Sequence, residues 1–250
     1  MANNPTARNA APDPAPYKLL SVIVPVYNER NTVGEIVRRM RLVELPIDLE
    51  IVVVDDGSTD GTDKVLAAIE DSTLRVVRHA SNRGKGAAVR TGIAAARGDL
   101  VLFQDADLEY DPQDWPRLLA PVLQGRTRVV YGSRYIGERE TMTILRWIGD
   151  RSLALMTTLL FNATVSDIET CYKLVDRTLL ESLHLEADGF EFEPEITAKL
   201  LRRKERIFEV PITYAGRALQ EGRKFTWRDG IKAGRTLLRE RFLPVNDGRR

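Results

Sequence analysis

The sequence predicts an α/β fold built around a mostly parallel β-sheet. Two observations lead to this class. Short runs of β-branched and other apolar residues alternate with segments whose apolar residues recur at helical spacing, and no linker-like composition divides the chain after residue 17. Strands that alternate with helices form βαβ units, which give parallel sheets with right-handed crossovers.

The first half of the chain carries the clearest alternation. Residues 1–17 are rich in Ala, Asn and Pro and lack periodicity, which predicts a disordered tail. Apolar runs then predict buried strands at 20–26, 50–54, 74–77 and 99–103. Helical spacing predicts helices between them, at 31–43, 61–69 and 86–96.

The second half is less regular. Its apolar spacing predicts helices at 114–123, 143–161, 193–203 and 226–242. Strands are predicted at 128–131, 169–175 and 206–214, the last at a sheet edge because Pro211 restricts its pairing. We therefore expect one ordered domain over residues 18–243 and a C-terminal tail at 244–250.

Bulk composition narrows the function classes. The 250 residues carry a formal net charge of +1, which does not indicate a nucleic-acid partner. Residues 201–250 hold 14 Lys and Arg against 6 Asp and Glu, so that end contacts either a local anionic partner or only solvent. The single cysteine, Cys171, suits a reducing cytoplasm. Neither a signal peptide nor a membrane-spanning run is visible, so we expect any membrane contact to be peripheral.

Polar motifs follow the four predicted strands of the first half. They are VPVYNE at 24–29, DDGSTDG at 55–61, NRGKG at 82–86 and DAD at 105–107. Because ligands bind at the carboxyl ends of the strands in open α/β sheets, these motifs predict one site. His79 and His184 have no partner at metal-ligand spacing and are expected to be incidental.

Asp105 and Asp107 are candidate metal ligands. Their i, i+2 spacing after a buried strand allows both carboxylates to face one cation. Hard oxygen ligands suit Mg²⁺ or Mn²⁺, which complete their shells with water and substrate phosphates. The alternative interpretation is turn chemistry, since Asp is common in turns.

Two further motifs offer contacts to a nucleotide. After the second strand, one carboxylate of Asp55 and Asp56 is available to a base or ribose, while residues 57–60 form a turn. The glycine loop at 82–86 opens a helix and carries Arg83 and Lys85, which favours an anion such as a diphosphate. A solvated basic turn is the alternative.

Taken together, these motifs resemble glycosyltransferase family 2, an inverting family with the GT-A fold. Further matching segments are GSRY at 132–135, ETCYK at 169–173 and EGRKFTWRDG at 221–230. The sequence is most similar to the polyprenol-phosphate, or dolichol-phosphate, mannose and glucose synthases. The resemblance implies a Rossmann-like, mostly parallel sheet flanked by helices, with amphipathic C-terminal helices.

The resemblance also implies an activity and its residues. It implies metal-dependent transfer of mannose or glucose from GDP-mannose or UDP-glucose to a polyprenyl phosphate, with Mg²⁺ or Mn²⁺ on Asp105 and Asp107. Donor-binding positions are Pro25, Tyr27, Glu29, Asp56, Lys85, Asp105, Arg217 and Lys224. Catalytic positions are Asp107, Arg134 and Arg146, the two arginines holding the acceptor phosphate. Asp150 stands where related enzymes have Ser, and a carboxylate there repels an acceptor phosphate unless it is turned away.

Two predicted helices have the pattern of interfacial helices. Residues 143–161 present Trp147, Ile148, Leu155 and Leu159, and residues 226–242 carry a basic stripe of Arg228, Lys232, Arg235 and Arg239. The alternative is ordinary docking of both helices on the sheet. We expect a peripheral protein on the cytoplasmic face of a membrane, with a separate membrane-protein partner as one possibility.

Other functions stay open. Transfer to a soluble saccharide or metabolite would need a carboxylate base, for which Glu109 or Asp111 is placed just after the DAD motif. A nucleotidyltransferase would carry a glycine-rich loop where this chain has VYNERN. A non-catalytic sugar-nucleotide-binding module is the third alternative, which the intact acidic and basic motifs argue against.

Overall fold

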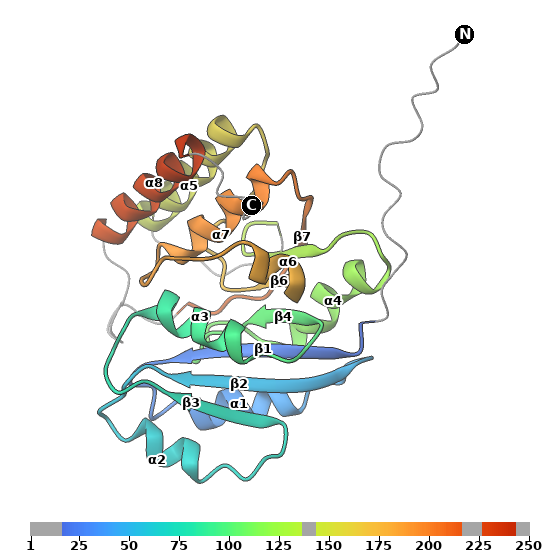
Figure 1. Ribbon diagram of the computed structural model, residues 1–250, viewed down its shortest axis with the longest axis vertical. Helices are drawn as coiled ribbons and strands as arrows, with labels where there is room; N and C mark the ends of the chain where they lie inside the picture. Colours follow the sequence, from blue (N-terminus) through green and yellow to red (C-terminus); the bar gives the residue numbers. More distant parts are fainter. Residues whose placement is uncertain (1–16, 137–143, 217–226, 244–250) are drawn as a thin grey trace, which may run out of the picture.

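A computed structural model describes residues 17–136, 144–216 and 227–243, and it describes the backbone alone for Leu145, Arg146, Trp227 and Arg228. These residues form one seven-stranded sheet with the strand order β3-β2-β1-β4-β6-β5-β7 (Figure 1). The predicted α/β class, with its mostly parallel sheet flanked by helices, is confirmed.

The first half of the sheet is parallel. It consists of β3 (Leu74–Arg78), β2 (Asp48–Asp55), β1 (Leu19–Val26) and β4 (Leu100–Phe103). β1 pairs with β2 on one side and with β4 on the other, and Val26 lies opposite Asp55. Since all four strands run the same way, their carboxyl ends lie at one edge of the sheet.

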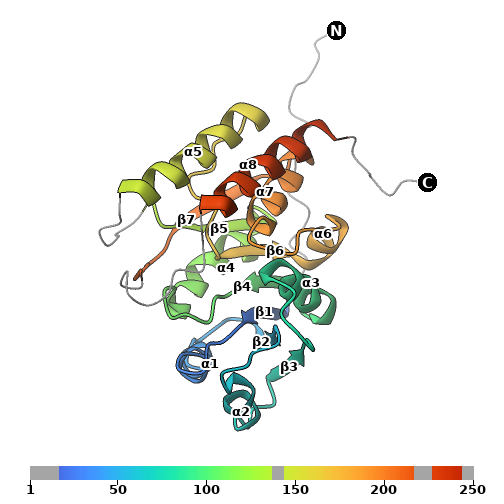
Figure 2. The same ribbon diagram turned by 90° about the vertical axis from the view of Figure 1, so that its left-hand side faces the viewer.

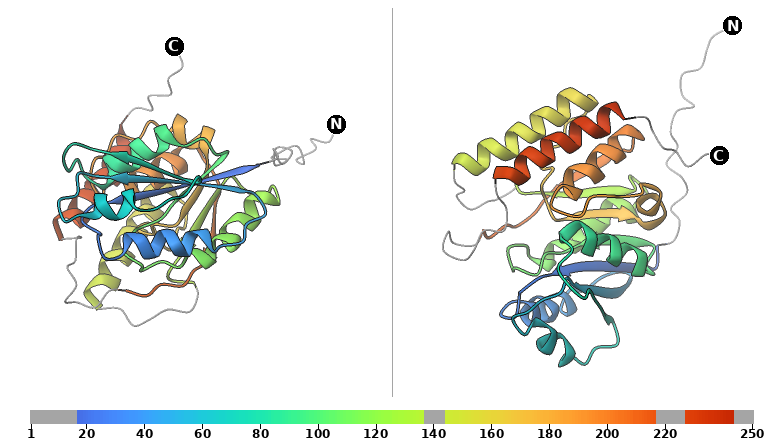
Figure 3. Two further views of the ribbon diagram at one scale, coloured as in Figure 1. Left: turned by 90° about the horizontal axis from the view of Figure 1, so that it is seen from below. Right: turned by 60° about the vertical axis from the view of Figure 1, so that its left-hand side comes forward.

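Helices cover both faces of this half. They are α1 (Val33–Arg41), α2 (Thr62–Ala67) and α3 (Lys85–Ala95). Figures 2 and 3 show α1 and α3 on opposite faces, which explains why the strands between them are continuously apolar. α3 approaches β1 closely, because a Cβ added at Gly92 would lie 2.3 Å from Cγ2 of Ile23.

The second half contains the reversed strand of the sheet. β6 (Lys173–Asp176) runs antiparallel between β4 and β5 (Val129–Ser133), and β7 (Ile207–Pro211) lies parallel to β5. The prediction that β7 is an edge strand is confirmed. β7 ends at Pro211, earlier than predicted, and Tyr214 instead forms an isolated bridge with Tyr110.

Two further elements differ from the sequence prediction. β6 begins at Lys173 rather than at residue 169, because the chain turns there: the amide of Tyr172 donates to Oγ1 of Thr170. The short helix α6 (Arg177–Ser182) was not predicted. Its signal was Asp176, whose side chain caps the helix by accepting from the amide of Leu179 at 2.9 Å.

Four more helices complete the fold. They are α4 (Trp115–Leu123), which follows a 3₁₀ turn at Pro112–Asp114, α5 (Ile144–Phe161), α7 (Phe192–Arg202) and α8 (Trp227–Phe242). α8 contacts both α5 and α7, and the α5–α8 pair forms an outer layer at one end of the molecule (Figures 1 and 2).

The α5–α8 layer is amphipathic. Ala233 and Leu237 are buried beneath α8, whereas the outer side of the layer exposes Leu155 (60%) and Leu159 (76%) of α5 and Phe242 (75%) of α8. Packing against the rest of the protein therefore explains the apolar side chains on one side of these helices but not those on the outer side. In the described part of the chain, every helix is too short or too polar to cross a bilayer.

Candidate active site

The loops after β1 and β2 are joined at the carboxyl edge of the sheet. The amide of Asn28 donates to Oγ of Ser58, and Oδ1 of Asn28 accepts from the amide of Thr59, both at 2.9 Å. Asn28 adopts a φ of 55°, in the left-handed region that Asn tolerates better than most residues. These bonds hold the VYNE and DDGSTDG motifs together as one rim.

The predicted donor-binding residues of β1 lie on this rim. Pro25 is half-buried near the end of β1, and the Tyr27 side chain is exposed. Glu29 is buried, and its Oε2 accepts from Oγ1 of Thr32 at 2.7 Å. The Tyr27 side chain is therefore partly accessible at this rim, whereas Glu29 is buried and engaged within the protein.

Asp56 joins β2 to the glycine loop. Its Oδ1 accepts from the amide of Arg83 at 2.9 Å, and its Oδ2 accepts from the amide of Gly84 at 2.8 Å. His79 Nδ1 lies 2.6 Å from the same Oδ1, a structural contact with a predicted site residue that the sequence did not indicate. The glycine loop favours an anion, and in this structure its amides bind the carboxylate of Asp56.

A second segment holds the glycine loop from the other side. The carbonyl oxygen of Asp188 accepts from the amide of Ala87 at 3.1 Å. A Cβ added at Gly84 or Gly86 would lie 2.3 Å from a backbone oxygen of this segment, at Asp188 and Ala187 respectively. The two glycines are thus required by close backbone approach. The sequence showed the glycines but not the segment at 186–189 that needs them.

Lys85 connects this loop to the acidic motif. Its Nζ lies 2.7 Å from Oδ1 of Asp105 and 3.7 Å from Oε1 of Glu193. Burial works against the charge of Lys85, but the carboxylates, Asp105 foremost, outweigh it and raise the pKa of Lys85 well above its ordinary value. Lys85 and Asp105, both predicted site residues, are therefore brought together.

Asp105 and Asp107 follow β4 directly, as predicted. Asp105 keeps 20% of its side chain exposed, and Oδ1 of Asp107 accepts from the amide of Glu109 at 3.2 Å. In the described ranges, no three Asp, Glu, His or Cys side chains are grouped so as to hold a metal by themselves. Two carboxylates at an open edge fit Mg²⁺ or Mn²⁺, because these ions bind through one or two carboxylates and take further oxygens from substrate phosphates.

On the other side of β6, Arg134 forms a buried ion pair with Asp167. Its Nε and Nη2 each donate to a carboxylate oxygen at 2.7 Å, and its amide also donates to Asp167 at 3.0 Å. Asp150 Oδ2 lies 3.7 Å from Nη2 of Arg134 and accepts from the hydroxyl of Tyr135. Asp150 is therefore not turned away from Arg134. Asp167 was not predicted from the sequence, although it precedes the ETCYK motif by two residues.

A buried cluster separates these two ion pairs. Nζ of Lys173 donates to the carbonyl of Ile168 at 2.8 Å and to Oε2 of Glu193, and none of its side chain is exposed. Burial raises the pKa of Glu193, and it raises the pKa of Glu169 to about 8. No sequence motif indicated that Glu193 is a neighbour of Lys85, because the two are brought together only by the packing of α7.

The two carboxylates considered as a base for a soluble acceptor are already engaged. Oε2 of Glu109 accepts from the hydroxyl of Tyr214 at 2.5 Å, and Oδ1 of Asp111 accepts from the amide of Gln113 at 3.0 Å. Of the remaining predicted residues, Arg217 and Lys224 lie outside the described residues. Arg146 lies in the first turn of α5, and its side chain is likewise outside the description.

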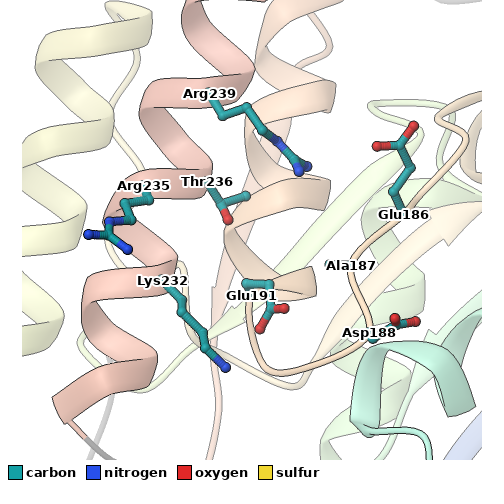
Figure 4. A pocket seen from close by; sticks show the side chains of 8 residues that line it. All are labelled: Glu186, Ala187, Asp188, Glu191, Lys232, Arg235, Thr236 and Arg239. Carbon is teal, nitrogen blue, oxygen red and sulfur yellow. The ribbon is translucent and has the colours of Figure 1, made fainter.

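The basic stripe of α8 borders a pocket rather than open surface alone. The pocket has a volume of about 530 Å³ and lies between α8 and the segment before α7 (Figure 4). In Figure 4, Lys232 and Arg239 point toward that segment, whereas Arg235 points the other way. The lining is balanced in charge: it holds Glu186, Asp188 and Glu191 as well as Lys232, Arg235 and Arg239, together with Ala187 and Thr236.

Comparison with known proteins gives relatives in both sequence and structure. The model of "Glycosyl transferase family 2" matches residues 21–183. The dolichol-phosphate mannosyltransferase of Pyrococcus furiosus is 30% identical over 210 residues, which are 82% of this chain and 58% of that protein. The undecaprenyl-phosphate 4-deoxy-4-formamido-L-arabinose transferase of Pseudomonas fluorescens is 29% identical over 82% of this chain and 59% of its own length.

Solved structures extend the likeness to the fold. A glucosyl-3-phosphoglycerate synthase from Mycobacterium tuberculosis, in complex with Mn²⁺, uridine diphosphate and glucosyl-3-phosphoglycerate, superposes with a TM-score of 0.70. It is 26% identical and covers 92% of this chain and 82% of its own. The expected GT-A architecture is confirmed. The chain spans about three fifths of the length of the two curated relatives described above.

Proposed function

Because the chain belongs to glycosyl transferase family 2, we propose that it transfers mannose or glucose from GDP-mannose or UDP-glucose to a polyprenyl phosphate at a membrane surface. Relatives named for transfer involving dolichol phosphate or undecaprenyl phosphate support this acceptor class. The relative crystallised with Mn²⁺ and uridine diphosphate supports a divalent metal and a nucleoside diphosphate leaving group.

The observation that carries the proposal is the acidic motif at the end of β4. Asp105 and Asp107 stand at the carboxyl edge of the sheet, with Nζ of Lys85 at 2.7 Å from Asp105. When Mg²⁺ or Mn²⁺ is bound there, it stabilises the charge of the departing diphosphate. Asp105 and Asp107 would hold the ion, while Lys85 supplies a second positive charge at the same edge.

The acceptor side supports a phosphate nucleophile. A phosphate monoester is already anionic near neutral pH, so its attack on the anomeric carbon requires positioning rather than a protein base. This agrees with Glu109 and Asp111 being engaged elsewhere. Among the described residues, Nη1 of Arg134 donates no hydrogen bond, and it is the nitrogen we propose for the acceptor phosphate, together with Arg146. Donor contacts from Pro25, Tyr27, Glu29, Asp56, Arg217 and Lys224 remain part of the proposal.

We further propose that the α5–α8 layer rests on the cytoplasmic face of the membrane. Exposed apolar side chains lie along both helices, with relative exposures of 60% at Leu155 and 76% at Leu159. Arg235 of α8, which points away from the pocket, adds a basic side chain to this layer, and amphipathic helices of this composition bind anionic interfaces. A separate membrane-protein partner would approach through the same face.

The test of the activity is product formation from a panel of nucleotide sugars. Each donor is incubated with Mn²⁺ or Mg²⁺ and either a short polyprenyl phosphate or 3-phosphoglycerate, and the products are separated by chromatography. Metal-dependent glycolipid, absent with Asp107→Ala, is the expected result and identifies the sugar. Product with 3-phosphoglycerate alone would replace the lipid acceptor by a soluble one. No product with any donor would favour the binding module.

The test of membrane contact is co-sedimentation with vesicles of phosphatidylcholine containing anionic phosphatidylglycerol. We expect wild-type protein in the pellet and the Leu155→Glu/Leu159→Glu variant in the supernatant, because charge on the apolar face opposes insertion. Leu42→Glu is the matched control, since Leu42 is 61% exposed at the end of α1, away from this layer. Equal sedimentation of all three proteins would contradict the proposed face.

A further inference from the structure

Lys85 lies between two carboxylates at unequal distances. Its Nζ is 2.7 Å from Oδ1 of Asp105 but 3.7 Å from Oε1 of Glu193. That Oε1 is buried, and within the described residues it makes no hydrogen bond. A buried carboxylate oxygen without a donor is costly, so its presence next to an ammonium calls for an explanation.

The other oxygen of Glu193 is fixed. Oε2 pairs with Nζ of Lys173, which is also bound by the carbonyl oxygens of Ile168 and Thr170 and is fully buried. Lys173 therefore cannot swing toward another partner without leaving three acceptors. Held in this way, Glu193 keeps its Oε1 directed toward Lys85.

The surroundings of Lys85 limit where its ammonium can move. The rings of Phe190 and Phe192 lie 5.8 Å and 5.6 Å from Nζ, and Asp105 lies on the open side, 20% exposed. A divalent cation on Asp105 competes with Lys85 for the same carboxylate and repels its charge. Among the described residues, Oε1 of Glu193 is then the nearest carboxylate oxygen left to it.

We propose that Glu193 is a positioning residue that receives Lys85 when Asp105 takes up a divalent cation. Glu193 lowers the cost of displacing Lys85 and thereby strengthens metal binding without touching the metal. The displaced Lys85 stays at the edge of the donor site, where a diphosphate binds. This inference rests on the metal site of the proposed function and adds to it a residue that no sequence motif indicated.

The test is a double-mutant cycle read out by Mn²⁺ binding, with free Mn²⁺ measured by electron paramagnetic resonance and no sugar donor present. Glu193→Gln is expected to weaken Mn²⁺ binding about tenfold, because Lys85 then has Asp105 as its sole carboxylate partner. Lys85→Met is expected to tighten binding, because the competitor for Asp105 is gone. In the Lys85→Met background, Glu193→Gln should change the affinity by less than about twofold.

Each alternative outcome is distinct. If Glu193→Gln weakens binding equally with and without Lys85, Glu193 acts on the cation by its charge alone and the proposal is overturned. If Lys85→Met weakens Mn²⁺ binding, Lys85 does not compete for Asp105 and the proposal also fails; this variant serves even where Glu193→Gln does not fold. If the wild-type protein binds no Mn²⁺, the proposed metal site itself fails. Glu169→Gln, in the same buried cluster, reports general loosening and should leave the affinity unchanged.

Discussion

The ion pairs Lys85–Asp105 and Arg134–Asp167 lie on opposite sides of the buried cluster and differ in how they are held. Lys85 meets Asp105 through one contact of 2.7 Å, and 17% and 20% of the two side chains are exposed. Arg134 meets Asp167 through two side-chain bonds and one backbone bond, and 4% and 0% are exposed. A single contact that water reaches can be exchanged for a ligand, whereas a buried bidentate pair holds the loops that form it.

The difference shows that a charged residue in a family motif can act in two ways. Lys85 has its positive charge available at the edge where the donor is proposed to bind. Arg134 has most of its hydrogen-bonding capacity committed to Asp167, so its proposed contact with an acceptor phosphate uses the remaining face of the guanidinium.

The largest effect is expected for Asp167→Asn. Removing one charge of a buried ion pair leaves Arg134 with the longer 3.7 Å contact to Asp150, and breaking such a pair costs about 4 kcal/mol of the free energy of unfolding. Urea denaturation followed by circular dichroism measures it. Glu181→Gln, which breaks the exposed Arg177–Glu181 pair on α6, is the control and should change stability by less than about 0.5 kcal/mol. Similar small losses of unfolding free energy in both variants would show that the Arg134–Asp167 pair does not hold its loops together.

The next effect is a pH dependence of the free energy of unfolding that comes from Glu169, near the Arg134–Asp167 pair. Burial first, and then the nearby carboxylates, raises the pKa of Glu169 from 4.5 to about 8. The folded state therefore holds a proton that the unfolded state loses near pH 4.5, and this contribution to stability disappears as the pH rises toward 8. We expect wild type to lose about 3 kcal/mol more than Glu169→Gln between pH 5 and pH 8. Parallel stability curves for the two proteins would refute it.

The Lys85–Asp105 pair depends on the backbone contact between the glycine loop and the 186–189 segment. A Cβ at Gly86 meets the carbonyl oxygen of Ala187 at 2.3 Å, so Gly86→Ala must push the two segments apart. We expect a loss of about 2 kcal/mol by thermal or urea unfolding. Gly149→Ala on α5, where a Cβ meets nothing within 4 Å, should stabilise by up to about 1 kcal/mol. A change of the same sign in the free energy of unfolding of both variants would contradict the close approach of the two segments.

The smallest effect on stability is expected for Lys85→Met. The methionine keeps the apolar stem against Phe190 and Phe192, and the Asp105 carboxylate left behind is partly reached by water. We expect a change of less than about 1 kcal/mol in the free energy of unfolding. A loss as large as that of Asp167→Asn would mean that Lys85 is structural and would remove the contrast between the two pairs.

The sequence predicted the parts of this molecule that depend on local pattern. Continuous apolar runs predicted β1, β2 and β4, and the motifs after them indicated one edge, where Lys85 and Asp105 meet. Helical spacing likewise predicted α5 and α8 within a residue or two of their bounds.

What the sequence did not reveal depends on contacts between distant segments. Asp167 meets Arg134 across 33 residues, and the 186–189 segment reaches the glycine loop across about a hundred. The sequence did not indicate the contact of His79 with Asp56, because the two residues follow different strands. Such contacts follow from packing, which no spacing within one segment reports.

The position of β6 has a consequence for how the protein is made. β4 and β5 precede β6 in the chain, yet each needs it as a neighbour in the sheet. While the ribosome synthesises residues 104–172, the apolar strand β4 has an open edge, and open edges of this kind recruit other chains. Arg134 likewise has no Asp167 to pair with until the segment that contains Asp167 has been synthesised. β4 and β5 therefore gain their shared neighbour late in synthesis, and until then their edges are open to pairing with other chains.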